Sequence, residues 1–159
     1  MHPSSFNSMS EFRRKFCNRP NLSVLDVGGV DINGSYKPIF KGCDYKTLDM
    51  DSRADIVVTD WTWPDLLTNA FDVVISGQCL EHDPKFWLTL QNIGRATKSG
   101  GYVCVIAPGK QGYHAFPKDY WRFMHDAPRV WAELAEVEFL EGWRNEDDIG
   151  DCGMIGRKP

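Results

Sequence analysis

The segment Val24–Tyr36, VLDVGGVDINGSY, joins an apolar run that ends in an acidic residue to a loop rich in glycine. The apolar run predicts a buried strand. The glycines allow backbone conformations and close approaches to a ligand that other residues hinder. A loop of this kind holds a phosphate group, holds a cofactor without phosphate, or only turns the chain. The rest of the sequence bears on which of the three applies.

The remainder of the 159-residue chain alternates short apolar runs with turns and helical patterns. Runs such as DIVV (55–58) and FDVVIS (71–76) lack alternation, which is typical of strands buried on both faces of a parallel sheet. The pattern predicts an α/β doubly wound domain, whose ligands bind beyond the carboxyl ends of the strands. The expected strands are Ser23–Val27, Tyr45–Asp49, Ile56–Thr59, Phe71–Ser76, Tyr102–Ala107, Val137–Gly142 and Cys152–Gly156, and the expected helices are Ser8–Cys17, Lys85–Thr97 and Asp126–Glu136.

Composition and charge limit the class of protein. With 42% hydrophobic residues, the chain is expected to form one domain over residues 1–159, with residues 1–20 as a helical N-terminal extension. The net charge of −4 argues against nucleic acid as a partner. Five cysteines without a CxxC pair predict reduced, mostly buried thiols. No apolar run suits a membrane span and the N-terminus lacks a signal-peptide core, so we expect a cytoplasmic protein.

The glycine loop departs from both nucleotide-binding fingerprints. Its spacing is GG-x4-G rather than G-x-G-x-x-G, and Ser35 stands where a P-loop has lysine. Asp26 and a second aspartate bring negative charge, which disfavours a phosphate and favours a cationic ligand. S-adenosylmethionine, which carries a sulfonium and an ammonium group, fits such a loop, although a turn without a ligand remains an alternative. The glycines concerned are Gly28, Gly29 and Gly34.

Acidic residues also end the next two strands. Asp49, followed by Met50, closes the second strand about twenty residues after the glycines, where a carboxylate can accept both hydroxyls of a ribose. Asp60 ends the third strand and precedes Trp61, so an acid and an aromatic ring could together hold an adenine. A solvated aspartate and a packed tryptophan are the alternatives. NAD and S-adenosylmethionine share the ribose, so this feature does not separate them.

The fourth strand ends in SGQCLEH (76–82), at the expected mouth of the site. Ser76 and Gln78 are candidates to line the cofactor. His82 is a candidate for function, although a single histidine is more often structural. Glu81 lies beside His82, but adjacent positions on one segment rarely converge on one ion, so we predict no metal site.

In order and spacing, these motifs resemble class I S-adenosylmethionine-dependent methyltransferases of the small bacterial-type group. The matching elements are VLDVGG with NGSY, LDMD, FDVVISGQCLEH, and a helix ending in KSGG before YVCVIAPG. The segment HAFPKDYWRF (114–123) resembles the Y/F-P-x-D-Y-W-R-F segment of one subgroup. The resemblance covers residues 22–128, most of the domain.

The resemblance implies a Rossmann-like, mostly parallel seven-stranded sheet whose last strand is antiparallel, and it implies S-adenosylmethionine as the cofactor. The resemblance assigns the methionine moiety to Asp26, Gly28 and their neighbours, the ribose to Asp49, and the adenine to Asp60 and Trp61. The family's loop reads D/E-x-G-x-G-x-G, whereas Val30 and Ile32 replace the later glycines here. This difference bears on the exact contacts that the loop makes with the cofactor.

Methyl transfer to a hydroxyl needs alignment and a base. His82 and His114 are candidates because imidazole titrates near neutrality, and Asp119 is a third. Arg122 can pair with Asp119 or anchor an anionic acceptor. The D/N-P-P-Y/F signature of amino-group methylation is absent after the fourth strand, so family analogy favours a small-molecule or glycan oxygen as acceptor.

Two other functions stay open. The irregular glycine loop would also suit a catalytically degenerate module that binds S-adenosylmethionine or S-adenosylhomocysteine without turnover. An NAD or nucleotide-sugar enzyme on a related fold is the other alternative, and the missing G-x-G-x-x-G argues against it. The sequence names neither the acceptor nor the oligomeric state.

Overall fold

The computed structural model describes residues 2–115 and 118–159. Its strands form a single seven-stranded sheet in the order β3-β2-β1-β4-β5-β7-β6. The strands are β1 (Ser23–Val27), β2 (Asp44–Asp49), β3 (Ile56–Val57), β4 (Phe71–Gly77), β5 (Thr97–Ala107), β6 (Glu138–Arg144) and β7 (Cys152–Arg157). The helices are α1 (Pro3–Phe16), α2 (Phe86–Ala96) and α3 (Ala127–Leu134), with short 3-10 turns η1 (Lys37–Phe40), η2 (Asp65–Leu67) and η3 (Leu80–His82).

The strand directions match the predicted sheet. Strands β1 to β5 pair in parallel, whereas β7 runs antiparallel to both β5 and β6. From β1 the chain proceeds outward to β2 and β3, and then returns to β4 on the other side of β1. The strand order therefore reverses at β1, which is where open α/β sheets bind their ligands. The predicted mostly parallel sheet with an antiparallel last strand is confirmed.

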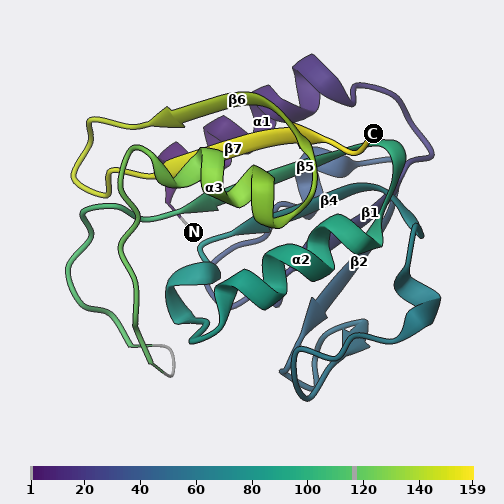
Figure 1. The fold of residues 1–159 in the computed structure, drawn as a ribbon, viewed down its shortest axis with the longest axis horizontal. Helices are drawn as coiled ribbons and strands as arrows, with labels where there is room; N and C mark the ends of the chain where they lie inside the picture. The colour runs from purple at the N-terminus through teal and green to yellow at the C-terminus, as the bar shows by residue number, and fades with distance from the viewer. Residues whose placement is uncertain (1, 116–117) are drawn as a thin grey trace.

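Both faces of the sheet are covered. In β4, Val74 packs into the core beside α2 and α3, while Val73 and Ile75 pack into a second core beside α1. Figure 1 shows α2 and α3 on one face and α1 on the other. Because both faces are apolar, the strands read as continuous hydrophobic runs rather than alternating ones.

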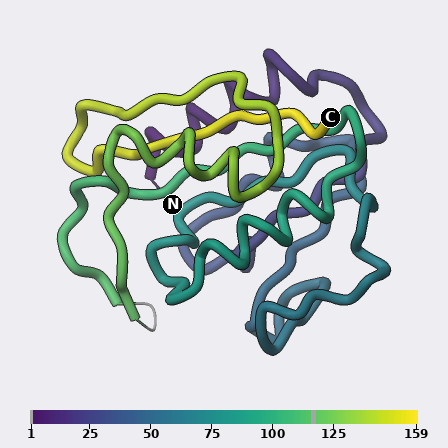
Figure 2. The backbone as a smooth tube through the Cα atoms, in the orientation of Figure 1, coloured from purple at the N-terminus to yellow at the C-terminus, as the bar shows by residue number. Residues whose placement is uncertain are grey.

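The expected elements differ from the observed ones mainly at their ends. Helix α1 begins at Pro3 rather than Ser8, with proline in its first turn, where no amide donor is needed. The short strand β3 ends at Val57. Asp126 precedes α3 as expected, but its side chain makes no capping hydrogen bond. The tube in Figure 2 shows the connection after β5 extending away from the sheet before it returns to α3.

Within the described residues, no helix has the length and apolar character that crossing a membrane requires. The five cysteines are all free thiols, and Cys17, Cys104 and Cys152 are buried, as expected.

Candidate active site

A cavity of about 980 Å³ opens at the carboxyl ends of the central parallel strands. The register brings these ends level, because Val27 of β1 pairs with Leu48 of β2 on one side and with Ser76 of β4 on the other. Most of the predicted site residues line this cavity. They are Asp26, Gly28, Gly29, Gly34, Asp49, Met50, Asp60, Trp61, Gln78, His82 and His114.

The glycine loop folds tightly against its neighbours. Gly28 has a φ of +76°, and a Cβ atom there would lie 2.4 Å from the Cys79 sulfur. A Cβ atom on Gly29 would lie 2.5 Å from the Asp26 carboxyl carbon. The Gly28 amide donates to the Leu48 carbonyl at 2.8 Å. Both glycines are therefore required by the packing of the loop itself, which leaves the loop backbone facing the cavity.

Asp26 lies at the buried floor of the cavity. Its side chain accepts a short hydrogen bond from the Tyr45 hydroxyl. Burial, together with the nearby Asp49 carboxylate, raises the pKa of this carboxyl to about 7 against the lowering effect of the Tyr45 hydrogen bond. A cationic ligand group beside Asp26 would reverse this shift and favour the ionised form.

The cavity is acidic. Among the described residues that line it, five are aspartates and one is a lysine, Lys118. An excess of carboxylates repels phosphate and attracts positive charge. The donor set therefore fits a sulfonium cofactor better than a phosphate group. The five aspartates are Asp26, Asp49, Asp51, Asp60 and Asp83.

Trp61 is held in place by polar contacts. Its indole nitrogen donates to Asp83 at 3.0 Å, and its carbonyl accepts from Asn92 at 2.7 Å. The Lys85 ammonium lies over the ring, 4.7 Å from the centroid. Asp60 receives the Thr62 amide at 2.6 Å, which fixes the start of this turn. The ring and the Asp60 carboxylate therefore stand on one rigid turn at the cavity wall.

The end of β4 places only part of SGQC in the cavity. Ser76 is completely buried, donates to the Val27 carbonyl at 3.0 Å and does not line the cavity, so its hydroxyl holds β4 to β1. Gln78 does line it, with a φ of +57°, and its amide donates to Asp151 at 2.8 Å. Asp151 also accepts from Ser4 of α1 at 3.0 Å. The N-terminal helix is thereby tied to the cavity wall.

Two histidines and a glutamate meet at the rim of the cavity. The rings of His82 and His114 lie 4.9 Å apart, edge to face. The Nε2 atoms of His82 and His114 lie 3.7 Å and 4.0 Å from the same Oε1 atom of Glu81. The Glu81 side chain is fully buried, and neither of its oxygens has a hydrogen-bond partner. Burial raises the pKa of Glu81 to about 8 and lowers the pKa of His82.

Asp119 forms an ion pair with Arg122 outside the cavity. Arg122 grips it with two hydrogen bonds, of 2.7 Å and 2.6 Å, and the His114 amide donates to it at 2.7 Å. The Arg122 hydrogen bonds hold the pKa of Asp119 far below its usual range. Asp119 does not line the cavity. Of the two roles considered for Arg122, pairing with Asp119 is observed. Within the matching segment, Phe116 and Pro117 lie outside the described residues.

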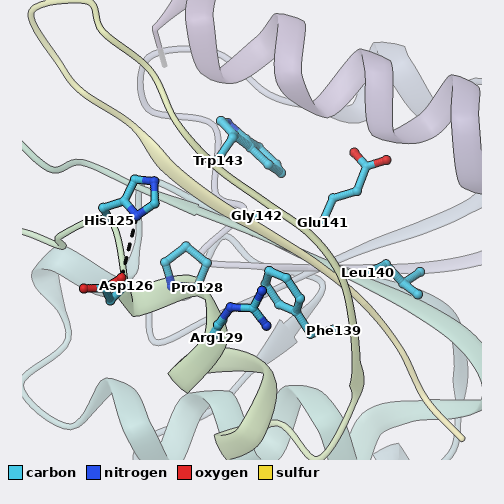
Figure 3. A pocket seen from close by; sticks show the side chains of 9 residues that line it. All are labelled: His125, Asp126, Pro128, Arg129, Phe139, Leu140, Glu141, Gly142 and Trp143. Atoms are coloured by element: carbon cyan, nitrogen blue, oxygen red, sulfur yellow. Dashed lines mark ion pairs between the residues drawn. The ribbon is translucent and has the colours of Figure 1, made fainter.

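A second cavity, of about 480 Å³, lies between the start of α3 and strand β6 (Figure 3). Its charged groups are already partnered. His125 lies 3.7 Å from Asp126, Arg129 stacks on Phe139 at 4.5 Å, and Glu141 pairs with a lysine of α1 at 3.5 Å. Because it stands away from the level strand ends and its charged side chains are paired, it is not the candidate site.

Comparison with known proteins agrees with this geometry. Residues 16–105 match the family model of a methyltransferase domain, which is more than half of the chain. The chain belongs to the methyltransferase domain family. No curated protein sequence matches it.

Methyltransferases are also among the solved structures that share this fold. The Burkholderia thailandensis 1,6-didemethyltoxoflavin-N1-methyltransferase, solved with its substrate and S-adenosylhomocysteine, has a TM-score of 0.75 at 16% identity, over 98% of this chain and 78% of that one. The magnesium protoporphyrin IX methyltransferase of Synechocystis, solved with S-adenosylmethionine, has a TM-score of 0.68 at 12% identity, over 98% and 79%. The [4+2]-cyclase SpnF has a TM-score of 0.73 at 13% identity, over 96% and 80%. These likenesses support the fold, and the predicted enzyme class agrees with the family.

The sequence does not reveal that Glu81 and His82 lie close to His114. The prediction of no metal site considers only neighbours on one segment, whereas the structure adds His114 from a distant one. The available signal was an acidic residue beside a histidine immediately after a strand end, with a further histidine after the next strand.

Proposed function

We propose that the chain transfers a methyl group from S-adenosylmethionine to an oxygen of a small molecule or glycan. The observation that carries this proposal is the acidic cavity at the level carboxyl ends of β1, β2 and β4. In this proposal the methionine moiety lies beside the glycine loop and Asp26, the ribose is held by Asp49, and the adenine lies at the turn of Asp60 and Trp61. Met50, Gly34 and Gln78 complete the lining.

When bound, S-adenosylmethionine supplies an electrophilic methyl group on a sulfonium centre. The chain's own residues then have three tasks. The glycine loop and Asp49 fix the position of the cofactor, the apolar wall from Val58 and Trp63 excludes water, and an imidazole accepts the acceptor's proton. His82 and His114 both line the cavity, so either can reach a bound acceptor.

An oxygen acceptor is favoured by the groups at the rim. Two imidazoles beside a buried carboxylate suit the removal of a hydroxyl proton. The segment after β4 lacks the D/N-P-P-Y/F quartet that would suit an exocyclic amine.

The test is a methyl-transfer assay with labelled S-adenosylmethionine and a panel of hydroxylated small molecules, sugars and amines. Formation of S-adenosylhomocysteine and of an O-methyl product, located by NMR, is the expected result. The matched pair His82→Gln and His125→Gln separates a rim histidine from an exposed one, and only the first is expected to lose activity. N-methyl products alone would contradict the proposed acceptor class.

A cofactor-binding module without methyl transfer is the second candidate, because a cyclase has the same fold. Tight binding of S-adenosylmethionine with no product from any acceptor class would favour it.

A further inference from the structure

Three metal-ligating side chains from two segments converge at the rim of the cavity. Glu81 and His82 follow β4, and His114 follows β5. One donor atom of each side chain lies within 4.8 Å of the others. Glu81 is fully buried, while the side chains of His82 and His114 are 18% and 35% exposed. The two imidazoles therefore line the cavity, and the carboxyl group lies buried behind them.

The hydrogen bonds of the two histidines involve Nδ1 on each ring. His82 directs Nδ1 to the Lys118 carbonyl at 2.7 Å, which favours the tautomer with a proton on Nδ1 and a lone pair on Nε2. The Nδ1 atom of His114 lies 3.3 Å from the Gly112 carbonyl, 3.4 Å from a guanidinium nitrogen of Arg122 and 3.5 Å from the Asp119 carboxylate. Both Nε2 atoms point toward Glu81. Metal-ligating histidines are oriented by second hydrogen bonds of this kind.

A metal ion would satisfy these groups together. Two imidazole nitrogens and the buried carboxyl group of Glu81 face one another, and both oxygens of Glu81 lack a hydrogen bond among the described residues. A buried carboxylate without a partner is strongly disfavoured. The nearby Arg122 cation is already paired with Asp119, so it does not complete the cluster.

The two segments are locked together around the cluster. The Glu81 carbonyl accepts the Tyr120 amide at 2.7 Å, in addition to the bond from His82 to Lys118. Arg122 also donates to the Gly112 carbonyl at 2.8 Å, which fixes the segment that leads to His114. The arrangement of the three donors is therefore set by the fold before any ligand binds.

We propose that Glu81, His82 and His114 bind a divalent transition-metal ion of the Zn²⁺ class, with its open coordination positions facing the cavity. Two imidazoles and one carboxylate are a donor set for zinc and for Fe²⁺ or Co²⁺, and not for Mg²⁺ or Ca²⁺. Ligands of a tetrahedral zinc lie roughly 3.3 Å apart, so binding would draw the three donor atoms together from their observed spacing of up to 4.8 Å.

The ion would select the acceptor. It would leave coordination positions open beside the cofactor cavity, and an oxygen bound there would release its proton to solvent before it accepts the methyl group. With the ion bound, His82 and His114 serve as ligands, and the ion takes the place of a free imidazole in activating the oxygen. The acceptor class is then a small molecule with a hydroxyl or enol oxygen able to coordinate a metal. This role rests on the proposed methyl transfer, whereas metal binding does not.

The test uses the full chain stripped of metal and titrated with Zn²⁺ by calorimetry and with Co²⁺ by visible absorption. Wild type is expected to bind one ion, with a Co²⁺ spectrum of nitrogen and oxygen ligation. Glu81→Gln and His114→Gln are expected to bind at least about tenfold more weakly, while the exposed His125→Gln binds as wild type. Thermal unfolding confirms that each variant is folded. If one of the two ligand variants does not fold, the other is enough for the test.

Absence of stoichiometric binding, or equal binding by wild type and the ligand variants, would overturn the metal site. Titration of each protein with S-adenosylmethionine is done in parallel. Metal binding without cofactor binding would refute the proposed function and leave the metal site intact. Cofactor binding without metal binding would overturn the metal site and leave the proposed function intact.

Discussion

Asp49 carries the most specific part of the proposed cofactor site at the scale of single residues. It ends β2 beside the glycine loop, and its Oδ1 atom accepts the Asp51 amide at 3.0 Å, which orients the carboxylate. A carboxylate can hold two ribose hydroxyls only when its orientation is fixed. The sequence predicted this role from the position of Asp49 alone.

Asp49→Ala is therefore expected to weaken S-adenosylmethionine binding about ten- to a hundredfold, the value of a charge-assisted hydrogen bond of about 1.5–3 kcal/mol. Calorimetric titration measures it. The exposed Asp65→Ala serves as the control for a lost negative charge. An unchanged affinity in Asp49→Ala would remove the ribose assignment.

Gly28→Ala is expected to lower the free energy of unfolding by roughly 2–5 kcal/mol, because it adds a left-handed backbone penalty to a clash with Cys79. Gly42→Ala is the matched control. Gly42 has a φ of +84° but open space around it, so it is expected to cost only about 1–2 kcal/mol. Urea unfolding measures both, and equal losses would show that the contact with Cys79 is unimportant.

The pKa of Asp26 predicts a pH dependence of stability. The folded protein holds the proton up to about pH 7, whereas the unfolded chain releases it near 3.8. Between these values the folded state binds more protons, so stability falls as the pH rises, by at most about 1.4 kcal/mol per pH unit.

Asp26→Asn removes this titration. Unfolding free energies of both proteins are measured without ligand from pH 4.5 to 8. Wild type is expected to lose stability relative to the variant as the pH rises to about 7, and the difference is then expected to stay constant. Parallel curves would show that Asp26 is ionised throughout.

Helix α1 contributes most at the scale of secondary-structure elements. The glycine loop after β1 is followed only by the short turn η1 before β2 begins. Helix α1 therefore covers much of the sheet face opposite α2 and α3. Met9 and Phe12 are fully buried against it. The sequence predicts a helix here, as part of an N-terminal extension. Amphipathic spacing shows that a helix forms but not which surface it packs against.

Phe12→Ala is expected to lower the free energy of unfolding by about 3–5 kcal/mol, the usual cost of removing a buried aromatic ring. Asn7→Ala, at an exposed position of the same helix, is expected to change it by less than about 0.5 kcal/mol. Chemical denaturation measures both. A small loss in Phe12→Ala would mean that α1 is dispensable for the fold.

The whole molecule shows what sequence patterns can and cannot give. Uninterrupted β-branched runs predicted the parallel strands, and the residues at their ends were gathered into one cavity as the topology requires. Ser76 and Asp119 do not line that cavity, because only packing decides whether a hydroxyl faces the cavity or a carboxylate is already paired. The meeting of Glu81 with His114 depends on where the connection after β5 returns, which no local spacing records.

The most direct test of the central claim is calorimetric titration of the purified chain with S-adenosylmethionine, S-adenosylhomocysteine and, as a control, NAD. The acidic cavity predicts one site that binds both adenosyl ligands and does not bind NAD. Failure to bind either adenosyl ligand, or binding of NAD alone, would contradict the assignment of VLDVGGVDINGSY as the seat of a sulfonium cofactor.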